Sequence, residues 1–396
     1  CASVWRILTY SVPSPPSSAS VMRILFCNTP YGVGGIGQHF AHLVEASRQR
    51  KMLGRYYATR TKPGDAAGVA VSAPTYGLLT HTPIRFFPSW RTHLKNDLFD
   101  RCLARRLSVP NEGSPRRLMG FVGKSLHTFR RGRELGVDLL ELIAANSHID
   151  NVRRLHACAA EDSGLHDSWL NGAQRRRTLK EYALADRIYV HSEYVRQSFL
   201  DAGIPAETLV RTVLEVAPRF RPPDERPSDD TFRIAYVGRV EMTKGIALLL
   251  EAFKRLPVDD AQLTFVGGWS TRAVRKYMQR HLANDPRIVL APGDPLPVLH
   301  RADVFVNPSY EDGFGYAPME ALACGVPVIV TEDTGMKEYV REGTSGFVVP
   351  TGSVDAIVDA LDCVRATPLA GTTSFLAPDP IPSGVVSPSL LSALEA

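Results

Sequence analysis

The chain of 396 residues lacks the features that mark membrane-spanning, disulfide-framed and zinc-binding proteins. No apolar run approaches the roughly 18 residues that a membrane helix needs. The six cysteines are scattered, and no two of them form a Cys-x-x-Cys pair. This argues against a zinc site or a disulfide framework and fits a reducing cytoplasm. The length is sufficient for two domains with hydrophobic cores of their own, so we expect a two-domain cytoplasmic protein.

Acidic residues are scarce in the first half of the chain. Residues 1–220 contain 30 Lys/Arg and 18 Asp/Glu, a net charge of +12, whereas residues 221–396 contain 16 and 23, a net charge of −7. The basic half is therefore expected to face an anionic partner or surface. Much of its charge lies between residues 101 and 133, interspersed with apolar residues at a spacing compatible with one helical face: Leu118, Phe121, Val122, Leu126 and Phe129. A basic amphipathic helix of this kind can lie on a membrane surface, but the same pattern suits a soluble enzyme with solvated arginines.

The most informative stretch is residues 307–330, NPSYEDGFGYAPMEALACGVPVIV. A buried strand is expected to end at Asn307, where this stretch begins. The stretch itself predicts a glycine-containing turn, a short helix and a second buried strand. In a parallel sheet, ligands bind in the loops that follow the carboxyl ends of the strands. Here the loop and helix carry the carboxylates of Asp312 and Glu320 and the free amides of Phe314 and Gly315. Carboxylates suit sugar hydroxyls and helix N-terminal amides suit a phosphate, so the unit predicts a site for an anionic, hydroxyl-rich ligand.

These residues resemble the donor-site motif of the retaining glycosyltransferases of family four (glycosyl transferases group 1), which have the two-domain GT-B fold. That motif is a Glu, seven residues and a second Glu, wrapped around a G-F-G turn. Keeping the turn aligned puts Asp312 at the first position and Glu320 at the second, whereas counting from Glu311 gives eight intervening residues. The resemblance implies that Glu320 binds the ribose hydroxyls of a nucleotide. It also implies that Asp312, with the amides near Gly315, holds the sugar ring. The alternative is a glycine-rich turn before an ordinary helix.

A second block that resembles the family lies about 70 residues earlier, at residues 238–245, GRVEMTKG. It follows an expected strand and precedes an expected helix. In the family, an Arg and a Lys five positions apart bind the diphosphate of the donor, which assigns this role to Arg239 and Lys244. Fixed cations are needed there because negative charge grows on the nucleoside diphosphate as it leaves. Two surface cations beside a helix start are the alternative.

The first half of the chain offers a glycine turn and a histidine. Residues 32–37, GVGGIG, separate an expected strand from an expected helix, and such a turn lets the backbone approach a phosphate or sugar. The turn resembles the N-terminal loop of the same family, which lies over the diphosphate and sugar of the donor and implies contacts from Gly34 and Gly35. A dinucleotide site and simple strand–helix packing are alternatives. His148 follows an expected strand and resembles the histidine of the family that contacts the donor sugar, although a core histidine fits as well. Weaker candidates are His39, His156, His166 and His191.

Together these patterns predict an α/β protein of GT-B architecture, in which two Rossmann-like domains face each other across a cleft. We expect a disordered extension over residues 1–21, an acceptor domain over 22–220, a linker over 221–230, a donor domain over 231–365 and an irregular tail over 366–396. The Pro/Ser-rich composition of the first residues favours Met22 as the natural start.

The implied reaction is transfer of a hexosyl group from a nucleotide-diphospho-sugar to a hydroxyl, with retention of the anomeric configuration. The resemblance implies no cofactor and no metal, since Arg239, Lys244 and helix N-termini would take the metal's place. The expected catalytic residues are Asp312, His148, Arg239 and Lys244. The expected donor-binding residues are Gly34, Gly35, Arg239, Lys244, Phe314, Gly315 and Glu320.

The expected partners are the nucleotide-sugar and a glycan or lipid-linked acceptor, without nucleic acid. Peripheral membrane contact through the basic first domain is weighed against a wholly cytosolic enzyme. The alternatives for function are a nucleotide-sugar epimerase of the same fold, a non-catalytic or truncated relative, and a nicotinamide-dependent dehydrogenase. The dehydrogenase would explain the glycine turns, but no acidic residue lies about 20 positions past the first turn to hold a ribose.

Overall fold

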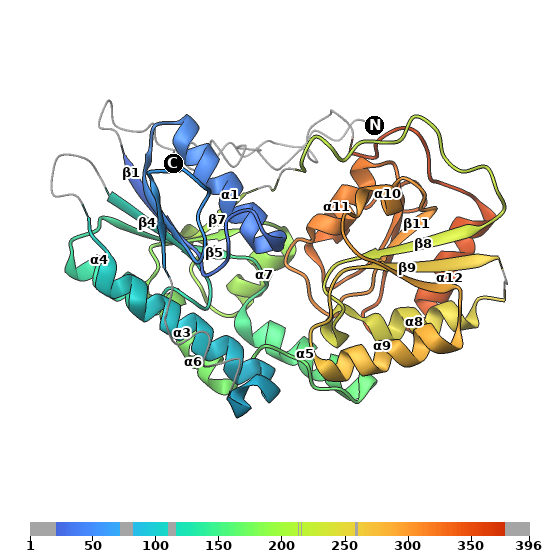
Figure 1. The fold of residues 1–396 in the computed structure, drawn as a ribbon, viewed down its shortest axis with the longest axis horizontal. Coiled ribbons are helices and arrows are strands. Elements are labelled where there is room, and N and C mark those ends of the chain that lie inside the picture. Colours follow the sequence, from blue (N-terminus) through green and yellow to red (C-terminus); the bar gives the residue numbers. More distant parts are fainter. Residues whose placement is uncertain are drawn as a thin grey trace, which may run out of the picture.

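The computed structural model describes residues 21–71, 82–109, 116–212, 214, 216–257 and 260–376, which form two parallel α/β domains side by side (Figure 1). Within these ranges the first sheet has the strand order β3-β2-β1-β4-β5-β6-β7 and the second has the order β10-β9-β8-β11-β12-β13. The strands of the first sheet are Met22–Phe26 (β1), Leu53–Ala58 (β2), Gly68–Ala70 (β3), Arg116–Phe121 (β4), Leu139–Ala144 (β5), Arg187–Val190 (β6) and Leu209–Arg211 (β7). Those of the second are Phe232–Val237 (β8), Ala261–Val266 (β9), Ile288–Ala291 (β10), Val304–Asn307 (β11), Val328–Thr331 (β12) and Gly346–Val349 (β13). The predicted α/β fold of two Rossmann-like halves is confirmed.

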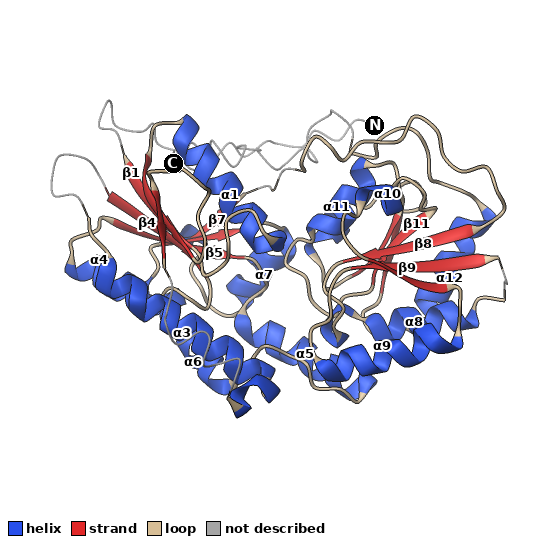
Figure 2. Cartoon of the chain, in the orientation of Figure 1, coloured by secondary structure: helices blue, strands red, loops and turns tan. Residues whose placement is uncertain are grey.

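Helices cover both faces of each sheet, as parallel strands that are buried on both sides require (Figure 2). The helices of the first domain are Gly34–Gln49 (α1), Pro88–Arg106 (α3), Leu126–Glu134 (α4), Ile149–Ser163 (α5), Gly172–Leu184 (α6) and Glu193–Asp201 (α7). Those of the second are Ile246–Arg255 (α8), Arg272–Asn284 (α9), Leu296–Leu299 (α10), Tyr316–Ala323 (α11) and Val354–Ala366 (α12). Short 3-10 turns lie at Pro83–Phe86 (η1), Ala206–Thr208 (η2), Met242–Lys244 (η3) and Gly335–Tyr339 (η4). Ser192 accepts a hydrogen bond from the Val195 amide and so caps α7, as its position after a strand predicts.

The prediction of one helical face among the basic residues of the first domain is wrong for most of that segment. Leu118 and Phe121 lie on β4, which pairs with β1 on one side and β5 on the other. Leu126 and Phe129 lie on α4, and their side chains are buried. A strand buried on both faces gives a continuous apolar run, whose members also fit a spacing of three or four residues. The apolar residues of this segment therefore form core and not a membrane face.

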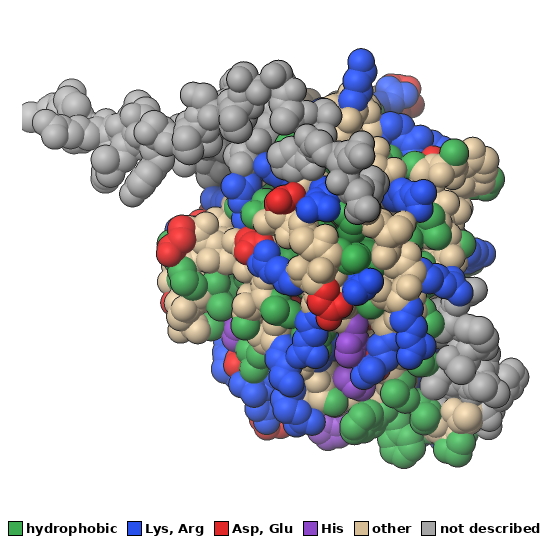
Figure 3. Space-filling model, turned by 90° about the vertical axis from the view of Figure 1, so that its left-hand side faces the viewer, with side chains coloured by type: hydrophobic (Ala, Val, Ile, Leu, Met, Phe, Trp, Pro, Cys, Tyr) green, Lys and Arg blue, Asp and Glu red, His purple; other side chains and the backbone are tan. Residues whose placement is uncertain are grey.

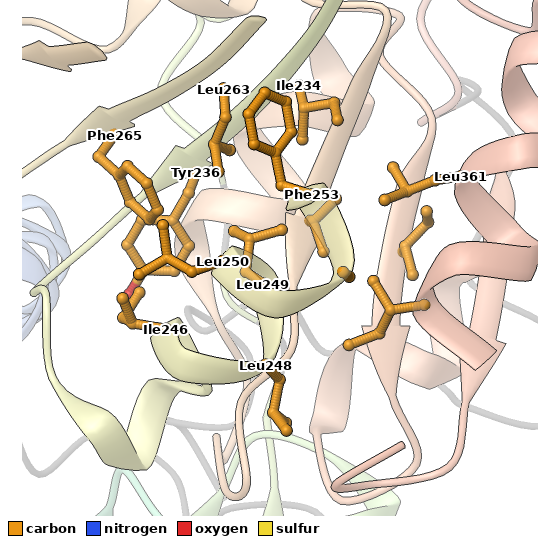
Figure 4. Packing of buried hydrophobic residues seen from close by; sticks show 14 of the residues in the cluster. Ile234, Tyr236, Ile246, Leu248, Leu249, Leu250, Phe253, Leu263, Phe265 and Leu361 are labelled. Atoms are coloured by element: carbon orange, nitrogen blue, oxygen red, sulfur yellow. The ribbon is translucent and has the colours of Figure 1, made fainter. Parts of the chain in front are cut away.

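One helix of the first domain, α5, packs on the second domain. Leu155 and Ala159 of α5 belong to the same buried cluster as Tyr236 on β8 and Leu249 on α8. Figure 4 shows the centre of this cluster, where side chains of β8, β9 and α8 interlock. In Figure 1, α5 lies between the two domains. The helix therefore ties the two halves together through apolar contact.

The segments between and after the domains show little regular structure, but part of the tail is fixed on α11. The Phe375 amide donates to the Leu322 carbonyl and the Gly371 amide donates to the Gly325 carbonyl, at 2.9 and 3.0 Å. The Arg226 guanidinium, in the expected linker, donates to carbonyls of Ala302, Cys324 and Gly371. Residues 1–20 and 377–396, where an extension and the rest of the tail are expected, lie outside the described residues. Within those described, no helix has both the length and the apolar character to cross a membrane.

Candidate functional site

The carboxyl ends of the two sheets face each other, and their loops touch. The carboxylate of Glu311, in the loop after β11, accepts hydrogen bonds from the Ser147 amide at 2.8 Å and the Asn146 side chain at 2.7 Å. Ser192, after β6, donates through its hydroxyl to the Gly313 carbonyl at 2.7 Å. The acidic loop of the second domain is therefore held directly against two strand ends of the first.

Two motif glycines allow this approach. A Cβ at Gly313 would lie 2.2 Å from the Ala145 carbonyl oxygen of the first domain. At Gly245, which has a φ of +69°, a Cβ would lie 1.9 Å from the Pro308 carbonyl oxygen. Any side chain at either position would force the backbones apart. The glycines of the two sequence blocks thus serve the contact between loops.

The structure brings the cationic block and the acidic block together. The Lys244 ammonium lies 3.0 Å from the Asp312 carboxylate and donates to the Glu311 carbonyl at 3.1 Å. Burial alone would lower the pKa of Lys244, but the carboxylates of Asp312, Glu311 and Glu241 hold it above its ordinary value. Lys244 is therefore a fixed cation, and it already engages the carboxylate that the sequence assigns to the sugar.

Arg239 projects from the same block toward the first domain. Its side chain is 60% exposed, and Glu241 lies 3.9 Å from its guanidinium. Burial lowers the pKa of Lys95 on α3, and the positive charges of Arg91 and Arg239 lower it further. Because Lys95 belongs to the first domain, Arg239 lies on the side of the second domain that faces it. An accessible guanidinium in this place can bind an anionic ligand that enters the cleft.

Glu320 lies on α11, one turn beyond the helix start. Burial raises its pKa to about 7, with Arg219 lowering it and Asp294 raising it. Those two neighbours form an ion pair of 2.8 Å with each other. No group in the described part of the chain donates a hydrogen bond to the Glu320 carboxylate. It is thus a partly buried acceptor that hydroxyl groups of a ligand could satisfy.

The helices α11 and α1 are among those whose N-termini no side chain of the N-cap residue caps. Gly315, with a φ of +83°, precedes α11, and Val33 precedes α1; neither supplies a side-chain hydrogen bond to the first turn. Gly34 and Gly35 open α1, are exposed and have no heavy atom within 4 Å of a Cβ added to them. Phe314 is buried, so only its backbone is a candidate contact. Uncapped amides of this kind suit phosphate oxygens.

Among the described residues, the His148 side chain contacts residues of its own domain and forms no hydrogen bond with the acidic loop. Its ring packs at 5.1 Å from the Tyr182 ring and 5.4 Å from the Phe199 ring, between the centroids. Its Nδ1 accepts from the Asp150 amide, so the side chain caps α5. Burial lowers its pKa. The geometry is that of a core histidine, and it is the neighbouring Ser147 that meets the second domain.

Two weaker histidine candidates lie at the seam between the domains. The rings of His39 on α1 and His191 after β6 are 4.6 Å apart, and the His39 ring is 6.5 Å from Tyr316, the first residue of α11. Burial lowers the pKa of both, that of His191 to about 4, so both are neutral. The Nε2 atoms of both are buried without a hydrogen-bond partner in the described chain. A histidine after a strand, the signal that selected His148, selects His191 equally well.

The matched family covers the region that holds these cations and carboxylates. Residues 219–366 match the model of the family described as glycosyl transferases group 1. This part of the chain therefore resembles the glycosyl transferases of group 1. It contains Arg239, Lys244, Asp312 and Glu320. Among the described residues, no group of three His, Cys, Asp or Glu side chains is arranged to hold a metal ion.

Curated proteins that resemble this chain are about a third identical to it within the aligned residues. The capsular polysaccharide biosynthesis glycosyltransferase CapM of Staphylococcus aureus is 34% identical over 139 residues, which cover 34% of this chain and 37% of the relative. The O-antigen chain mannosyltransferase B of Escherichia coli is 29% identical over 213 residues, covering 50% and 52%. The chain thus spans about a third to a half of the length of these relatives.

Solved structures extend the likeness to both domains. Sucrose-phosphate synthase from Thermosynechococcus elongatus superimposes with a TM-score of 0.66 and 19% identity, covering 89% of this chain and 92% of that one. WaaG, a glycosyltransferase of lipopolysaccharide biosynthesis, gives 0.63 and 16%, covering 88% and 92%. HepE of Anabaena in complex with UDP-glucose gives 0.60 and 16%, covering 89% and 92%. The chain therefore has the GT-B fold of two Rossmann-like domains.

Proposed function

We propose that this chain is a retaining glycosyltransferase, which moves a hexosyl group from a nucleotide-diphospho-sugar to a hydroxyl of a glycan or glycolipid. The observation that carries the proposal is the ion pair of Lys244 with Asp312 beside the exposed Arg239. The pair lies at the loop after β11, which contacts the first domain. An anionic leaving group and a hydroxyl-rich sugar need these two kinds of group side by side.

Each residue takes a role that its position supports. Arg239 and Lys244 hold the diphosphate and neutralise the charge that develops on it as the glycosidic bond breaks. The uncapped N-terminus of α11 and the open glycine turn of α1 add backbone amides from either side. Asp312 accepts from the sugar, and Glu320 accepts from the ribose hydroxyls.

Relatives support the choice of substrates. The HepE crystals contain UDP-glucose, which supports a nucleotide-sugar donor for the present cleft. CapM is named for capsular polysaccharide and WaaG for lipopolysaccharide biosynthesis, which supports a polysaccharide or glycolipid acceptor. No cofactor or metal is assigned to the reaction, because the cations and amides above supply the positive charge at the diphosphate.

A thermal-shift panel of UDP, GDP, ADP and their sugar conjugates tests the donor site. We expect one nucleotide to raise the melting temperature of the wild-type protein, and Lys244→Met to reduce the rise. Lys254→Met, which removes an exposed lysine of α8, is the matched control and should retain it. If no nucleotide binds, or if both variants behave alike, the assignment of the cleft is refuted.

The same nucleotide-sugar then separates the transferase from an epimerase of the same fold. Incubated alone with the protein, the donor of a transferase should release nucleoside diphosphate and free sugar slowly. An epimerase would instead convert the donor to its epimer, which proton NMR resolves. Formation of the epimer would overturn the proposal in favour of that alternative, and binding without any turnover would favour a non-catalytic relative.

We also propose that the enzyme acts in the cytoplasm at a membrane surface, which the first domain contacts. The exposed aromatic residues Phe87 (58%) and Trp90 (49%) lie at the start of α3, with Arg91 beside them. In Figure 3, Lys/Arg and hydrophobic side chains lie next to each other over the end of the first domain. Aromatic rings and cations together favour anionic lipid headgroups.

Sedimentation with vesicles of rising anionic lipid content tests this contact. Binding should increase steeply with lipid charge, fall with salt, and weaken in the Phe87→Ser/Trp90→Ser double variant. Arg255→Ser on α8, in the other domain, is the control. Equal and negligible sedimentation with neutral and anionic vesicles would refute membrane contact.

A further inference from the structure

The first domain has a second place suited to a ligand, at the turning point of its sheet. In the order β3-β2-β1-β4-β5-β6-β7, the chain proceeds in one direction from β1 and in the other from β4. The loops after these two adjacent strands therefore diverge and leave a crevice at their carboxyl ends. The loop after β4 has the sequence VGKS, residues 122–125, and places Lys124 there.

Lys124 is a nearly buried cation that the described protein does not neutralise. Its residue is 7% exposed, and no Asp or Glu of the described ranges forms an ion pair or hydrogen bond with its ammonium. The ammonium lies over the ring of Phe121, 5.8 Å from the centroid. The Lys124 side chain is largely buried, which fixes the position of the ammonium, and a fixed cation without a carboxylate partner favours an anionic ligand.

The carboxylates near this loop are committed elsewhere. Glu181 accepts from the amides of Ser125 and Leu126 at 2.9 and 3.1 Å, and pairs with Arg177. Asp100 also pairs with Arg177 and accepts from the Thr128 amide at 2.8 Å. These contacts hold the loop in place without reaching the Lys124 ammonium.

Neutral polar side chains fix the backbone that carries Lys124. Gln174 donates through Nε2 to the Gly123 carbonyl at 3.1 Å, and its Oε1 lies 3.2 Å from Nδ1 of His93. Gly123 has a φ of +85°, and a Cβ there would lie 2.5 Å from the Gln174 amide nitrogen and 3.8 Å from that of Asn96. Asn96 in turn accepts from Asn28, which follows β1. The crevice is thus lined by amides and an imidazole, which suit hydroxyl groups.

Ring contacts connect Lys124 to the donor side of the cleft. Phe121, which carries the Lys124 ammonium over its ring, lies 5.5 Å from the His39 ring. The His39 ring lies 6.5 Å from Tyr316, which opens α11 in the second domain. Lys124 and the donor helix therefore border the same interdomain region, from opposite domains.

We propose that Lys124 is the anion-binding residue of the acceptor site, and that the acceptor is a hydroxyl compound with a phosphate or carboxylate group. This inference rests on the proposed transferase function, in which Arg239 and Lys244 hold the donor's diphosphate. Lys124 belongs to the first domain and lies beside neutral polar groups, so it would bind an anionic group of the acceptor and not the diphosphate of the donor. The acceptor hydroxyl would lie between Lys124 and the sugar at α11.

The test compares glucose 6-phosphate and glucuronate with neutral glucose, by ligand-observed NMR, with and without saturating nucleotide. The wild-type protein should bind both anionic sugars at least tenfold more tightly than glucose. Lys124→Gln should lose this preference, Lys124→Arg should keep most of it, and Lys180→Gln, an exposed lysine on α6, should change nothing. Nucleotide affinity, measured by calorimetry, should be the same in all four proteins.

The outcomes separate this inference from the proposed function. Failure of any nucleotide to bind counts against the function, while the sugar titrations without nucleotide still judge the subsite. Equal binding of anionic and neutral sugars, or none, overturns the inference. So does a loss of nucleotide affinity in Lys124→Gln, since Lys124 would then belong to the donor site. If vesicles containing phosphatidylinositol compete with glucose 6-phosphate in the wild type, the anion is that of a lipid headgroup; otherwise it is that of a soluble acceptor.

Discussion

The protonation of Glu320 makes donor binding depend on pH near neutrality. Burial raises the pKa of this carboxyl to about 7, so about a tenth of the molecules carry the charge at pH 6 and about nine tenths at pH 8. Ribose hydroxyls donate to a carboxylate better than to a neutral carboxyl, which means that the donor binds the ionised form more tightly. Affinity should therefore be low below pH 7 and rise as the pH passes through 7.

The size of the effect follows from the hydrogen bonds. A bond to a charged group contributes about 1.5–3 kcal/mol, which corresponds to roughly tenfold or more in the dissociation constant. Glu320→Gln removes the charge at every pH. It should weaken binding by about that factor at pH 8, change it little at pH 6, and make affinity nearly independent of pH.

Calorimetric titration of the nucleotide-sugar at pH 6, 7 and 8 measures this directly. A nucleotide-sugar is preferable to a free nucleoside diphosphate, whose terminal phosphate titrates in the same range. Repeating each titration in two buffers of different ionisation enthalpy counts the proton that binding should release near pH 6. Glu251→Gln, an exposed acid on α8, is the control and should retain the pH dependence. The same pH dependence in Glu320→Gln as in the wild type would refute the role of this carboxylate.

Two further predictions concern the loops that join the domains. Arg239→Ala and Lys244→Ala should each reduce turnover at saturating donor more than they reduce donor affinity. The effects on turnover should be less than additive in the double variant, because both residues act on one diphosphate. Loss of affinity without loss of turnover would contradict a role in the transition state. Glu311→Ala leaves the Ser147 amide without its acceptor, so the free energy of unfolding should fall by about 1–3 kcal/mol. Small-angle scattering should show a larger radius of gyration for this variant. Glu332→Ala, which changes an exposed residue, should leave both quantities unchanged.

The sequence predicts those parts of the site that are local. The strand, turn and helix around residues 307–330 and the cationic block at 238–245 appear at nearly the expected positions, because apolar runs, glycines and caps within about ten residues determine such units. Their meeting through Lys244 and Asp312 also follows, since both loops leave the carboxyl edge of one parallel sheet.

What the sequence could not predict depends on contacts between distant segments. Glu311 and Asp312 are adjacent acids, and only the approach of the first domain shows that Glu311 turns to Ser147 while Asp312 meets Lys244. In the same way, a histidine after a strand gives no sign of whether its ring enters the core, as that of His148 does, or the seam between domains, as that of His191 does. The apolar residues of β4 resembled a helical face because both of its faces are buried.

Transfer of a sugar from a nucleotide donor with retention of configuration can be followed directly. Proton NMR of the sugar released early from the nucleotide-sugar that binds measures this most directly, because the two anomers give separate signals before they interconvert. We expect the first sugar to appear to have the anomeric configuration of the donor, with one nucleoside diphosphate released for each sugar, and we expect Lys244→Ala to slow both. Release of the opposite anomer, or formation of an epimer without loss of nucleotide, would contradict this expectation.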